Sequence, residues 1–470
     1  MILQIISLSA LGFLVCSALL DAAPPHPLPE KYLLLDSRIV DATENVRLRL
    51  GKVIKHPANP LFAEDKPWEV RFDNLYPNVI YDADEKLYKC WYSPFIVDVA
   101  TAETPPEARA NCRYQPRERE MAICYATSRD GLHWEKPNLG VIEFNGSRQN
   151  NIVMRLPHGA GVFQDKHDPD PSRQYKAIFK YQGDMAVAFS ADGVRWSQPI
   201  SCPAMNAVGD THNNAFWSES QQQYVGITRL WDHRRGIRQV GRSESPDFMN
   251  WTPASVILEG LEPHLQTYTM PVFQCSGIYI GLLMIFNTQT DRVHCELTWS
   301  PDTRQWHRIA PGEAFIPNGI EKGAYDWGCV YAAAYPVFLR EEIRLYYGAS
   351  NGPHTNWRDG FLALATLRPD GFAGAQPVSN TMPGIVTTIP ISCSGKHLHI
   401  TADMHDGAVR AEILDARGYA LADCLPITKS CTNQKIGWRS GADLHPFFGK
   451  AVKIKFEVRN ATLYSFSFSD

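Results

Sequence analysis

The sequence lacks several features that would direct it toward common protein classes. It has no long run of charges of one sign, and 46 Lys and Arg residues face 50 Asp and Glu residues, for a formal net charge of −4. Proteins that bind nucleic acid concentrate Lys and Arg against the phosphates, so nucleic acid is not an expected partner. The sequence also has no long segment of helical periodicity, which favours an all-β fold.

Several catalytic and metal motifs are missing as well. There is no Gly-x-Ser-x-Gly elbow, no phosphate-binding loop, no His-Glu-x-x-His and no Cys-x-x-Cys. These absences argue against a serine hydrolase of that type, a nucleotide-binding enzyme, a zinc protease and a structural zinc site. We therefore expect no required cofactor and no catalytic metal. A structural calcium ion near the axis of a β-propeller, the fold predicted below, is not excluded.

The first 23 residues form an apolar segment that ends in Ala22-Ala23 and is followed by a Pro-rich stretch. This pattern predicts a secretory signal peptide at residues 1–23, cleaved near residues 18–23, and hence a secreted, extracellular protein. The segment has no basic residue before its apolar run, so a membrane anchor is the alternative. No other segment is apolar enough to cross a bilayer, so no membrane contact is expected after cleavage.

An exported chain permits disulfides and N-glycosylation. Eleven cysteines occur, and ten remain after removal of Cys16 with the signal. Cys112 with Cys124, and Cys424 with Cys431, are close enough in the sequence to be local pairs. Three glycosylation sequons fit the same route: Asn145-Gly-Ser, Asn250-Trp-Thr and Asn460-Ala-Thr.

What the sequence does contain is a repeat. The form Ser-x-Asp-x-x-x-Trp occurs four times, with Trp at 134, 196, 251 and 306, and a degenerate fifth copy lies at 368–372. Each copy follows short strands rich in β-branched and aromatic residues, the pattern of an antiparallel meander. The Ser and Asp side chains can bond to nearby backbone N–H groups and fix a tight hairpin, so these Asp residues are interpreted as structural.

Five such units predict a five-bladed β-propeller at residues 60–382. Residues 24–59 lack the pattern and are expected to form an N-terminal extension. Strand signals without the Asp turn continue over residues 383–470 and predict a C-terminal β-sandwich.

Polar residues at the start of the innermost strands share one funnel at the propeller axis. Carboxylates that face each other there suit glycosidic bond cleavage, in which one group donates a proton and another acts as nucleophile or base. The predicted catalytic residues are Asp73, as nucleophile or base, Asp210, which would orient substrate or tune a pKa, and Asp326 as acid, with Glu262 and Glu321 in reserve. The predicted substrate-binding residues are Arg71, Asn74, His212, Asn213, Tyr268, His354 and Arg358.

Over residues 60–470 the chain resembles the five-bladed propeller glycoside hydrolases, with family 32 nearest and family 43 as a cousin. The segments that carry the resemblance include Tyr76–Asp82, Leu87–Tyr92, Gly209–Asn214 and Leu364–Phe372. The resemblance implies a propeller followed by a sandwich, and it implies that Asp73 is the blade-one nucleophile. The catalytic motifs diverge: no Pro-Asn-Gly follows Asp73, and the Arg-Asp-Pro and Glu-Cys motifs of family 32 are absent, so fructan specificity does not carry over.

The sequence therefore predicts a secreted glycoside hydrolase that acts on an oligo- or polysaccharide. One alternative is a carbohydrate-binding, lectin-like propeller without turnover. Another is a sialidase-like enzyme, because Asp turns of this form occur in that group and arginines could bind an acidic sugar. The candidate arginines are Arg71, Arg229, Arg242 and Arg358.

Overall fold

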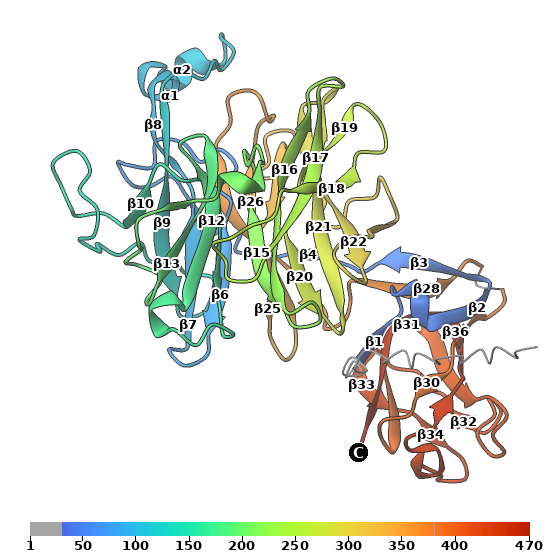
Figure 1. Cartoon of the computed structure of the whole chain (residues 1–470). Helices are drawn as coiled ribbons and strands as arrows, with labels where there is room; N and C mark the ends of the chain where they lie inside the picture. The colour runs from blue at the N-terminus through green and yellow to red at the C-terminus, as the bar shows by residue number, and fades with distance from the viewer. Residues whose placement is uncertain (1–30, 380) are drawn as a thin grey trace, which may run out of the picture.

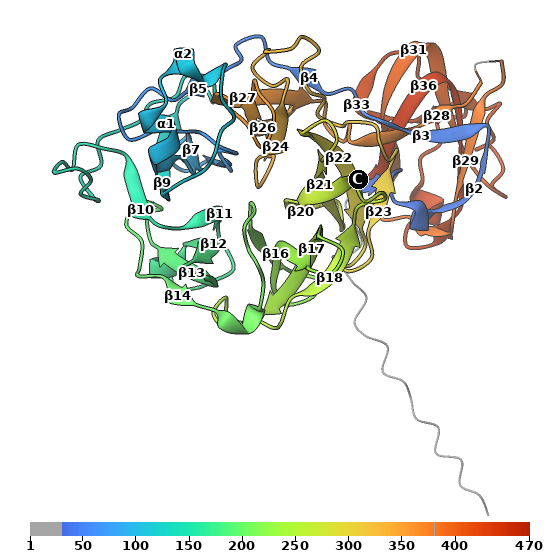
Figure 2. The same cartoon turned by 90° about the horizontal axis from the view of Figure 1, so that it is seen from above.

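The computed structural model describes residues 31–379 and 381–470 (Figure 1). The predicted signal peptide, residues 1–23, lies outside the described residues. Within the described ranges, no helix is both long and apolar enough to span a membrane. The strands form five blades around an axis and a separate β domain beside them, so the predicted all-β fold of propeller and C-terminal β domain is confirmed (Figure 2).

Blades one to three are antiparallel sheets with four main strands each, named here from the axis outward. Blade one contains β6 (Asn78–Asp82), β7 (Leu87–Tyr92), β9 (Arg119–Ser128) and β10 (Ile152–Arg155), and a fifth strand, β8 (Phe95–Asp98), pairs antiparallel with β9. Blade two contains β11 (His158–Gln164), β12 (Tyr175–Tyr181), β13 (Asp184–Ser190) and β14 (Ile200–Ser201). Blade three contains β15 (Asn214–Ser218), β16 (Gln223–Asp232), β17 (Ile237–Ser245) and β18 (Ser255–Glu259).

Blades four and five are joined by a single parallel bridge between β22 and β24. Blade four contains β19 (Leu265–Thr269) with β20 (Val272–Cys275), β21 (Ile278–Asn287), β22 (Arg292–Ser300) and β23 (His307–Ile309). Blade five contains β24 (Cys329–Ala332) with β25 (Val337–Phe338), β26 (Ile343–Ser350) and β27 (Gly360–Leu367).

The second strand of each blade is largely buried on both faces because each blade packs between two neighbours. In β21, nine consecutive residues from Ile278 to Phe286 are buried. Such a strand loses the strict alternation of a sheet with one face in water and reads as a continuous apolar run. Packing against both neighbouring blades thus holds each blade in place around the axis.

The Asp turns lie between the third and fourth strands of their blades and have the predicted structure. In the third copy, Oδ1 of Asp247 accepts hydrogen bonds from the backbone N–H groups of Met249 at 2.9 Å and Asn250 at 2.8 Å. Trp251 then donates from its indole nitrogen to the carbonyl oxygen of Phe248 at 3.0 Å. Asp130, Asp192 and Asp302 accept the equivalent pairs of backbone bonds.

Replacing Asp247 by Ala should therefore lower the free energy of unfolding and leave activity unchanged. Two backbone N–H groups lose their acceptor, which corresponds to a loss of about 1–2 kcal/mol. Chemical denaturation compared with the wild type measures the loss. An equal loss of activity would place this turn in the functional site.

Residues 31–59, the described part of the predicted N-terminal extension, are not separate from the two domains, and this boundary needs correction. The described part of this segment belongs to both domains. β4 (Ile54–Lys55), followed by β5 (Phe62–Ala63), pairs with β27 and supplies the outer edge of blade five. β1 (Lys31–Leu33), β2 (Val40–Glu44) and β3 (Val46–Leu50) pair with strands of the C-terminal domain. Strands of two to five residues are too short to show a periodic pattern, so this pairing could not be predicted from the sequence.

The C-terminal domain is built on two long strands, β31 (His397–Ile413) and β36 (Ile454–Ser469), which pair along most of their length. A register shift between Met404 and Ala408 bends β31, so residues on both sides of the bend enter one core. The remaining strands are β28 (Ala373–Pro377), β29 (Gly384–Thr388), β30 (Ile391–Ser392), β32 (Cys424–Leu425), β33 (Cys431–Lys435), β34 (Gly437–Trp438) and β35 (Ala451–Val452).

The predicted disulfides are not formed. All ten cysteines of the described residues are free, and Cys124 is fully buried inside blade one whereas Cys112 is exposed in the insertion that precedes β9. Cys424 is buried and Cys431 lies on β33. Closeness in the sequence was a poor guide because each pair spans a strand boundary that separates the two side chains.

Candidate active site at the propeller axis

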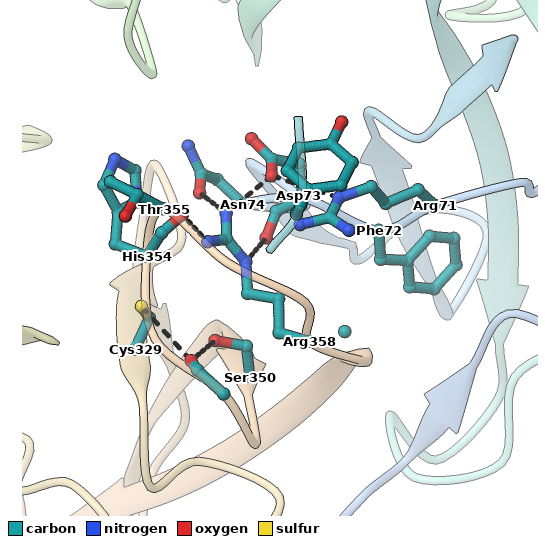
Figure 3. Close-up of polar contacts among 12 residues, drawn as sticks. Arg71, Phe72, Asp73, Asn74, Cys329, Ser350, His354, Thr355 and Arg358 are labelled. Carbon is teal, nitrogen blue, oxygen red and sulfur yellow. Dashed lines mark hydrogen bonds and ion pairs between the residues drawn. The ribbon is translucent and has the colours of Figure 1, made fainter. Parts of the chain in front are cut away.

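Asp73 lies in the loop that enters β6, the innermost strand of blade one, and is held by two arginines. Its Oδ1 is 2.6 Å from Nη2 of Arg358, which comes from the blade-five loop between β26 and β27, and 3.5 Å from Nε of Arg71 (Figure 3). Burial alone would raise the pKa of Asp73, but the positive charges of Arg358 and Arg71 outweigh it and lower the pKa to about 2. Asp73 is therefore an ionised carboxylate at neutral pH.

The carboxylate remains accessible to a ligand. Asp73 keeps 16 % of its side chain exposed, and its Oδ2 has no hydrogen-bond partner among the residues that the structure describes. Arg358 is fully buried and also bonds to backbone carbonyl oxygens of its own loop. Oδ1 of Asp73 is thus fixed by Arg358, while Oδ2 is free to contact a substrate.

Asn74 connects this carboxylate to the middle of the axis. Its Oδ1 accepts a hydrogen bond from Arg358 at 3.0 Å. Its Nδ2 donates to the hydroxyl of Tyr76 at 2.7 Å and to the hydroxyl of Tyr268, on β19 of blade four, at 2.9 Å. Both tyrosines are buried. Asn74 therefore orients two phenols as well as Arg358 and does not itself face solvent.

A second carboxylate, Asp210, lies in the loop that enters β15. Its Oδ1 is 2.6 Å from Nε2 of His158, the first residue of β11, and its Oδ2 is 3.7 Å from Nη1 of Arg229 on β16. Burial raises the pKa of Asp210, but the hydrogen bond and charge of His158 and the charge of Arg229 lower it below its usual range. Asp210 is more open than Asp73, with 54 % of its side chain exposed.

The two carboxylates belong to one connected network, because Arg229 also donates to the carbonyl oxygen of Tyr268 at 2.7 Å. We call this network the axial cluster; its members are Arg71, Asp73, Asn74, Tyr76, His158, Asp210, Arg229, Tyr268 and Arg358. It joins loops and strands from all five blades at the same end of the propeller. A cavity of about 330 Å³ opens beside His158 and is lined by Phe95 and Arg119.

Two further histidines at this end are neutral; His212 is buried and His354 is half-buried. His354 contacts the hydroxyl of Tyr331 through Nδ1 at 2.7 Å, and burial together with the charge of Arg358 lowers its pKa well below the usual value. His212 lies beside Tyr76, with Nε2 3.2 Å from Oδ1 of Asn78, and burial lowers its pKa to about 3. Both rings support neighbouring side chains rather than carry charge.

Other predicted residues lie away from the axial cluster. Asn213 donates only to backbone carbonyl oxygens, among them that of Gly159. Asp326 is buried within blade five, where its Oδ2 is 2.5 Å from Nζ of Lys55 and accepts a hydrogen bond from Tyr347. Glu262 and Glu321 are exposed, and no ion pair or hydrogen bond joins them to the axial cluster. Arg242 bonds to Glu244, Gln221 and Thr303, with no bond to the axial cluster.

The sequence analysis missed His158. It opens the innermost strand of blade two, the same place from which the other blades supply polar residues. The polar residues just before blade two in the sequence, Asn150 and Asn151, end the preceding connection and bond within blade one. The signal for His158 is its position as the first residue of β11, the innermost strand of blade two.

An insertion between β8 and β9 covers blade one at the end of the propeller that holds the axial cluster. It contains α1 (Val99–Glu103) and α2 (Pro106–Arg109), which stand above blade one (Figure 1). Tyr114 of the insertion donates to Asp98, packs its ring 4.0 Å from the guanidinium of Arg71, and bonds through its backbone N–H to Asn356. The insertion thus links blade one to the blade-five loop that carries Arg358.

Glu64 is a half-buried carboxyl group whose pKa is shifted in the opposite direction to that of Asp73. Its Oε1 accepts hydrogen bonds from the backbone N–H groups of Phe72 at 2.8 Å and Gly360 at 3.4 Å, but burial outweighs these bonds and raises its pKa to about 7. Because the folded state disfavours the ionised form, the wild type should lose stability as pH rises from about 4.5 through 7. The loss amounts to up to about 3 kcal/mol.

Replacing Glu64 by Gln keeps the acceptor oxygen and removes the titration. The variant should be more stable than the wild type at pH 8 and should lose this advantage at pH 5. Denaturation midpoints at the two pH values measure the effect. An unchanged difference between the two proteins across this range would contradict the raised pKa.

No cluster of three or more His, Cys, Asp or Glu side chains suited to a metal ion occurs in the part of the chain that the structure describes. The structural calcium considered from the sequence stays an untested prediction.

No family model matches the chain, and no curated protein matches it. Similar solved structures include a β-1,2-mannobiose phosphorylase from Listeria innocua, with 13 % identity over 67 % of this chain and 97 % of that one and a TM-score of 0.47. They also include an N-acetylgalactosamine deacetylase from F. plautii, with 14 % identity over 69 % and 96 % of the chains and a TM-score of 0.45.

A glycosyl hydrolase from Bacteroides ovatus is similar at 14 % identity over 70 % of this chain and 98 % of that one, with a TM-score of 0.43. At these identities and TM-scores, the likeness assigns neither an activity nor a substrate to the chain.

Proposed function

We propose that the chain is a glycoside hydrolase whose active site is the axial cluster. The observation that carries this proposal is the state of Asp73: a partly exposed carboxylate, kept ionised by Arg358 and Arg71, with one oxygen free. Cleavage of a glycosidic bond needs an ionised carboxylate beside the anomeric carbon, as nucleophile or as base on water. Asp73 meets this requirement, and its other oxygen, Oδ1, is held by the buried Arg358.

The second requirement is a proton for the departing sugar oxygen. Asp210 is ionised and lies 2.6 Å from Nε2 of His158, so we assign the role of proton donor to His158 rather than to Asp210. Nδ1 of His158 makes no hydrogen bond within the described residues and is the ring atom left to exchange the proton. In this scheme Asp210 is a positioning residue, and His158 takes the place that the sequence analysis gave to Asp326.

The resulting reaction balances without a cofactor. His158 donates its proton to the glycosidic oxygen while the bond between that oxygen and the anomeric carbon breaks. Either Asp73 attacks the anomeric carbon, and water later releases the sugar, or Asp73 takes a proton from a water molecule that attacks directly. In both routes one water is consumed and the proton returns to His158 before the next turnover.

We also propose that the protein is exported and meets its glycan outside the cell. The support is the apolar segment at residues 1–23 and the three sequons. An N-linked glycan at Asn145 or Asn250 in the purified mature protein, together with a new N-terminus near residue 24, would support export. Retention of residues 1–23 with membrane association would favour the anchor instead.

The test is sugar release from a broad glycan panel, followed by mass spectrometry, with binding to a glycan array measured in parallel. Release of defined saccharides by the wild type supports the hydrolase. Binding to the array without release from any glycan would overturn the hydrolase and favour a carbohydrate-binding, lectin-like propeller.

A further inference from the structure

Arg229 and Arg238 form a pair of like charges at the axial end of blade three. They lie on the hairpin of β16 and β17, where Arg229 is opposite Val240 and Arg238 is opposite Trp231. Side chains alternate between the faces of a sheet, so this register puts the two arginines on the same face as diagonal neighbours. Both guanidinium groups lie against Tyr268, with carbon atoms 4.3 Å and 5.6 Å from the centre of its ring.

The pair lacks matching negative charge. Arg229 has one carboxylate partner, Asp210 at 3.7 Å, which His158 shares at a shorter distance. Arg238 has no carboxylate within 4.0 Å among the described residues; it donates to the neutral amide oxygen of Gln266 at 2.6 Å. Burial and the nearby charge of Arg229 together lower the pKa of Arg238, as expected for a cation held near another cation.

Unused donors accompany this excess charge. The Nε atoms of Arg229 and Arg238 are buried and have no hydrogen-bond partner within the described residues. The side chain of Arg229 is only 3 % exposed, and a buried donor without a partner destabilises the fold unless a ligand or water satisfies it. Trp231, 4.8 Å from the guanidinium of Arg238, and Tyr268 hold the two planar groups in place, which lowers the entropy lost when they bind.

The same imbalance extends over the whole site. With Arg71 and Arg358, four guanidinium groups face two carboxylates, Asp73 and Asp210. On the Asp73 side both arginines lie within 4.0 Å of the carboxylate, whereas on the blade-three side Arg238 has no carboxylate that close among the described residues. A substrate that brings a negative charge to this side would be held by charge-assisted, two-pronged hydrogen bonds.

We propose that Arg229 and Arg238 form an anion subsite that binds a carboxylate or sulfate group carried by the substrate sugar. This inference rests on the proposed function, since it names the class of glycan that the same site accepts. An acidic polysaccharide is then preferred over a neutral one of the same backbone. Asp210 has a second role here, because it neutralises part of the charge of Arg229 and directs the anion toward Arg238.

The test compares matched glycans that differ only in the anionic group. An oligogalacturonide and its carboxyl-reduced form make one pair; 6-sulfated and unsulfated N-acetyllactosamine make the other. Affinities are measured by calorimetry in an Asp73→Asn background, where turnover does not interfere. We expect the acidic member of one pair to bind more tightly, and Arg238→Gln to weaken that binding about tenfold to hundredfold while leaving the neutral member unchanged.

Arg234→Gln is the matched control, because it removes the same charge from the tip of the same hairpin. Arg234 is exposed, and its side chain makes no hydrogen bond or ion pair with the described residues. Arg238→Lys keeps the charge without the planar fork and should give an intermediate affinity; it also serves if the Gln variant fails to fold.

The outcomes separate this inference from the proposed function. Preference for the carboxylated or the sulfated pair identifies the source of the anion. Equal binding of acidic and neutral glycans, unaffected by Arg238→Gln, overturns the anion subsite and leaves the hydrolase standing. If the wild type neither binds nor cleaves any glycan of either kind, the proposed function fails and the subsite with it.

Discussion

Replacing Asp73 by Asn should lower kcat/KM by at least about 10³-fold, the range expected when a group that acts on the reacting bond is removed. The amide has nearly the shape of the carboxylate but cannot attack an anomeric carbon or take a proton from water. Most of the loss should appear in kcat, because binding of the sugar depends mainly on other residues of the axial cluster. Steady-state kinetics on the glycan identified by the panel measures the change.

Stability must be followed alongside activity. Asp73→Asn leaves Arg358 fully buried without its nearest counter-charge, and breaking such a pair destabilises a fold by roughly 3–5 kcal/mol. The native pKa of about 2 lies below the usual 3.8, so the stability contributed by the ionised Asp73 is present above pH 4 and is lost as pH falls toward 2. This contribution is about 2 kcal/mol, and the Asn variant should lack that part of the acid dependence.

Asp326→Asn is the matched control for both effects. It removes another buried carboxylate of the propeller, one that pairs with Lys55 and Tyr347 rather than with the axial cluster. It should destabilise the fold and leave kcat/KM of the folded protein unchanged. Equal losses of activity in the two variants would mean that Asp73 acts only through the fold, and the site would have to be abandoned.

The second large effect is expected at His158. Replacing His158 by Gln should lower kcat about 10²- to 10³-fold, because the departing sugar oxygen loses its proton donor. The loss should be smaller for a synthetic substrate whose leaving group needs no protonation, such as a dinitrophenyl glycoside. A structural role alone would reduce the rates of both substrates equally.

Asp210→Asn tests how the histidine is positioned. Oδ1 of Asp210 lies 2.6 Å from Nε2 of His158, so removal of the carboxylate should let the ring move and lower kcat, with a smaller loss on the dinitrophenyl glycoside. Steady-state kinetics of the wild type, Asp210→Asn and His158→Gln on both kinds of substrate measures this. Equal losses on the two substrates in both variants would exclude the pair as the proton donor.

Much of the fold could be predicted because its signals are local. The Asp turn needs only a Ser, an Asp and a Trp within seven residues, and the structure contains the predicted backbone bonds at Asp247 and its equivalents. Counting these turns gave five blades. The strands β4 and β5 could not be found in this way, since their pairing with β27 joins segments about 300 residues apart and depends on no local pattern.

The site was predictable only in part. Asp73, Asp210 and Asp326 all precede innermost strands, and chain position alone does not distinguish them. What separates them is the direction of each side chain: Asp73 and Asp210 join the axial cluster, while Asp326 turns toward Lys55 on the outer strand β4. Lys55 lies on one of the short strands that the sequence did not indicate, so the partner that holds Asp326 was hidden as well.

The most direct test of the central claim is a crystal structure of the Asp73→Asn variant with an oligosaccharide that the wild type cleaves. The account predicts a sugar at the axial end, with its anomeric carbon about 3–3.5 Å from the side chain of residue 73 and its glycosidic oxygen facing His158. A sugar bound only elsewhere would contradict the account. One such place is the hollow of about 930 Å³ between blade four and the C-terminal domain, lined by Arg38 and Gln274.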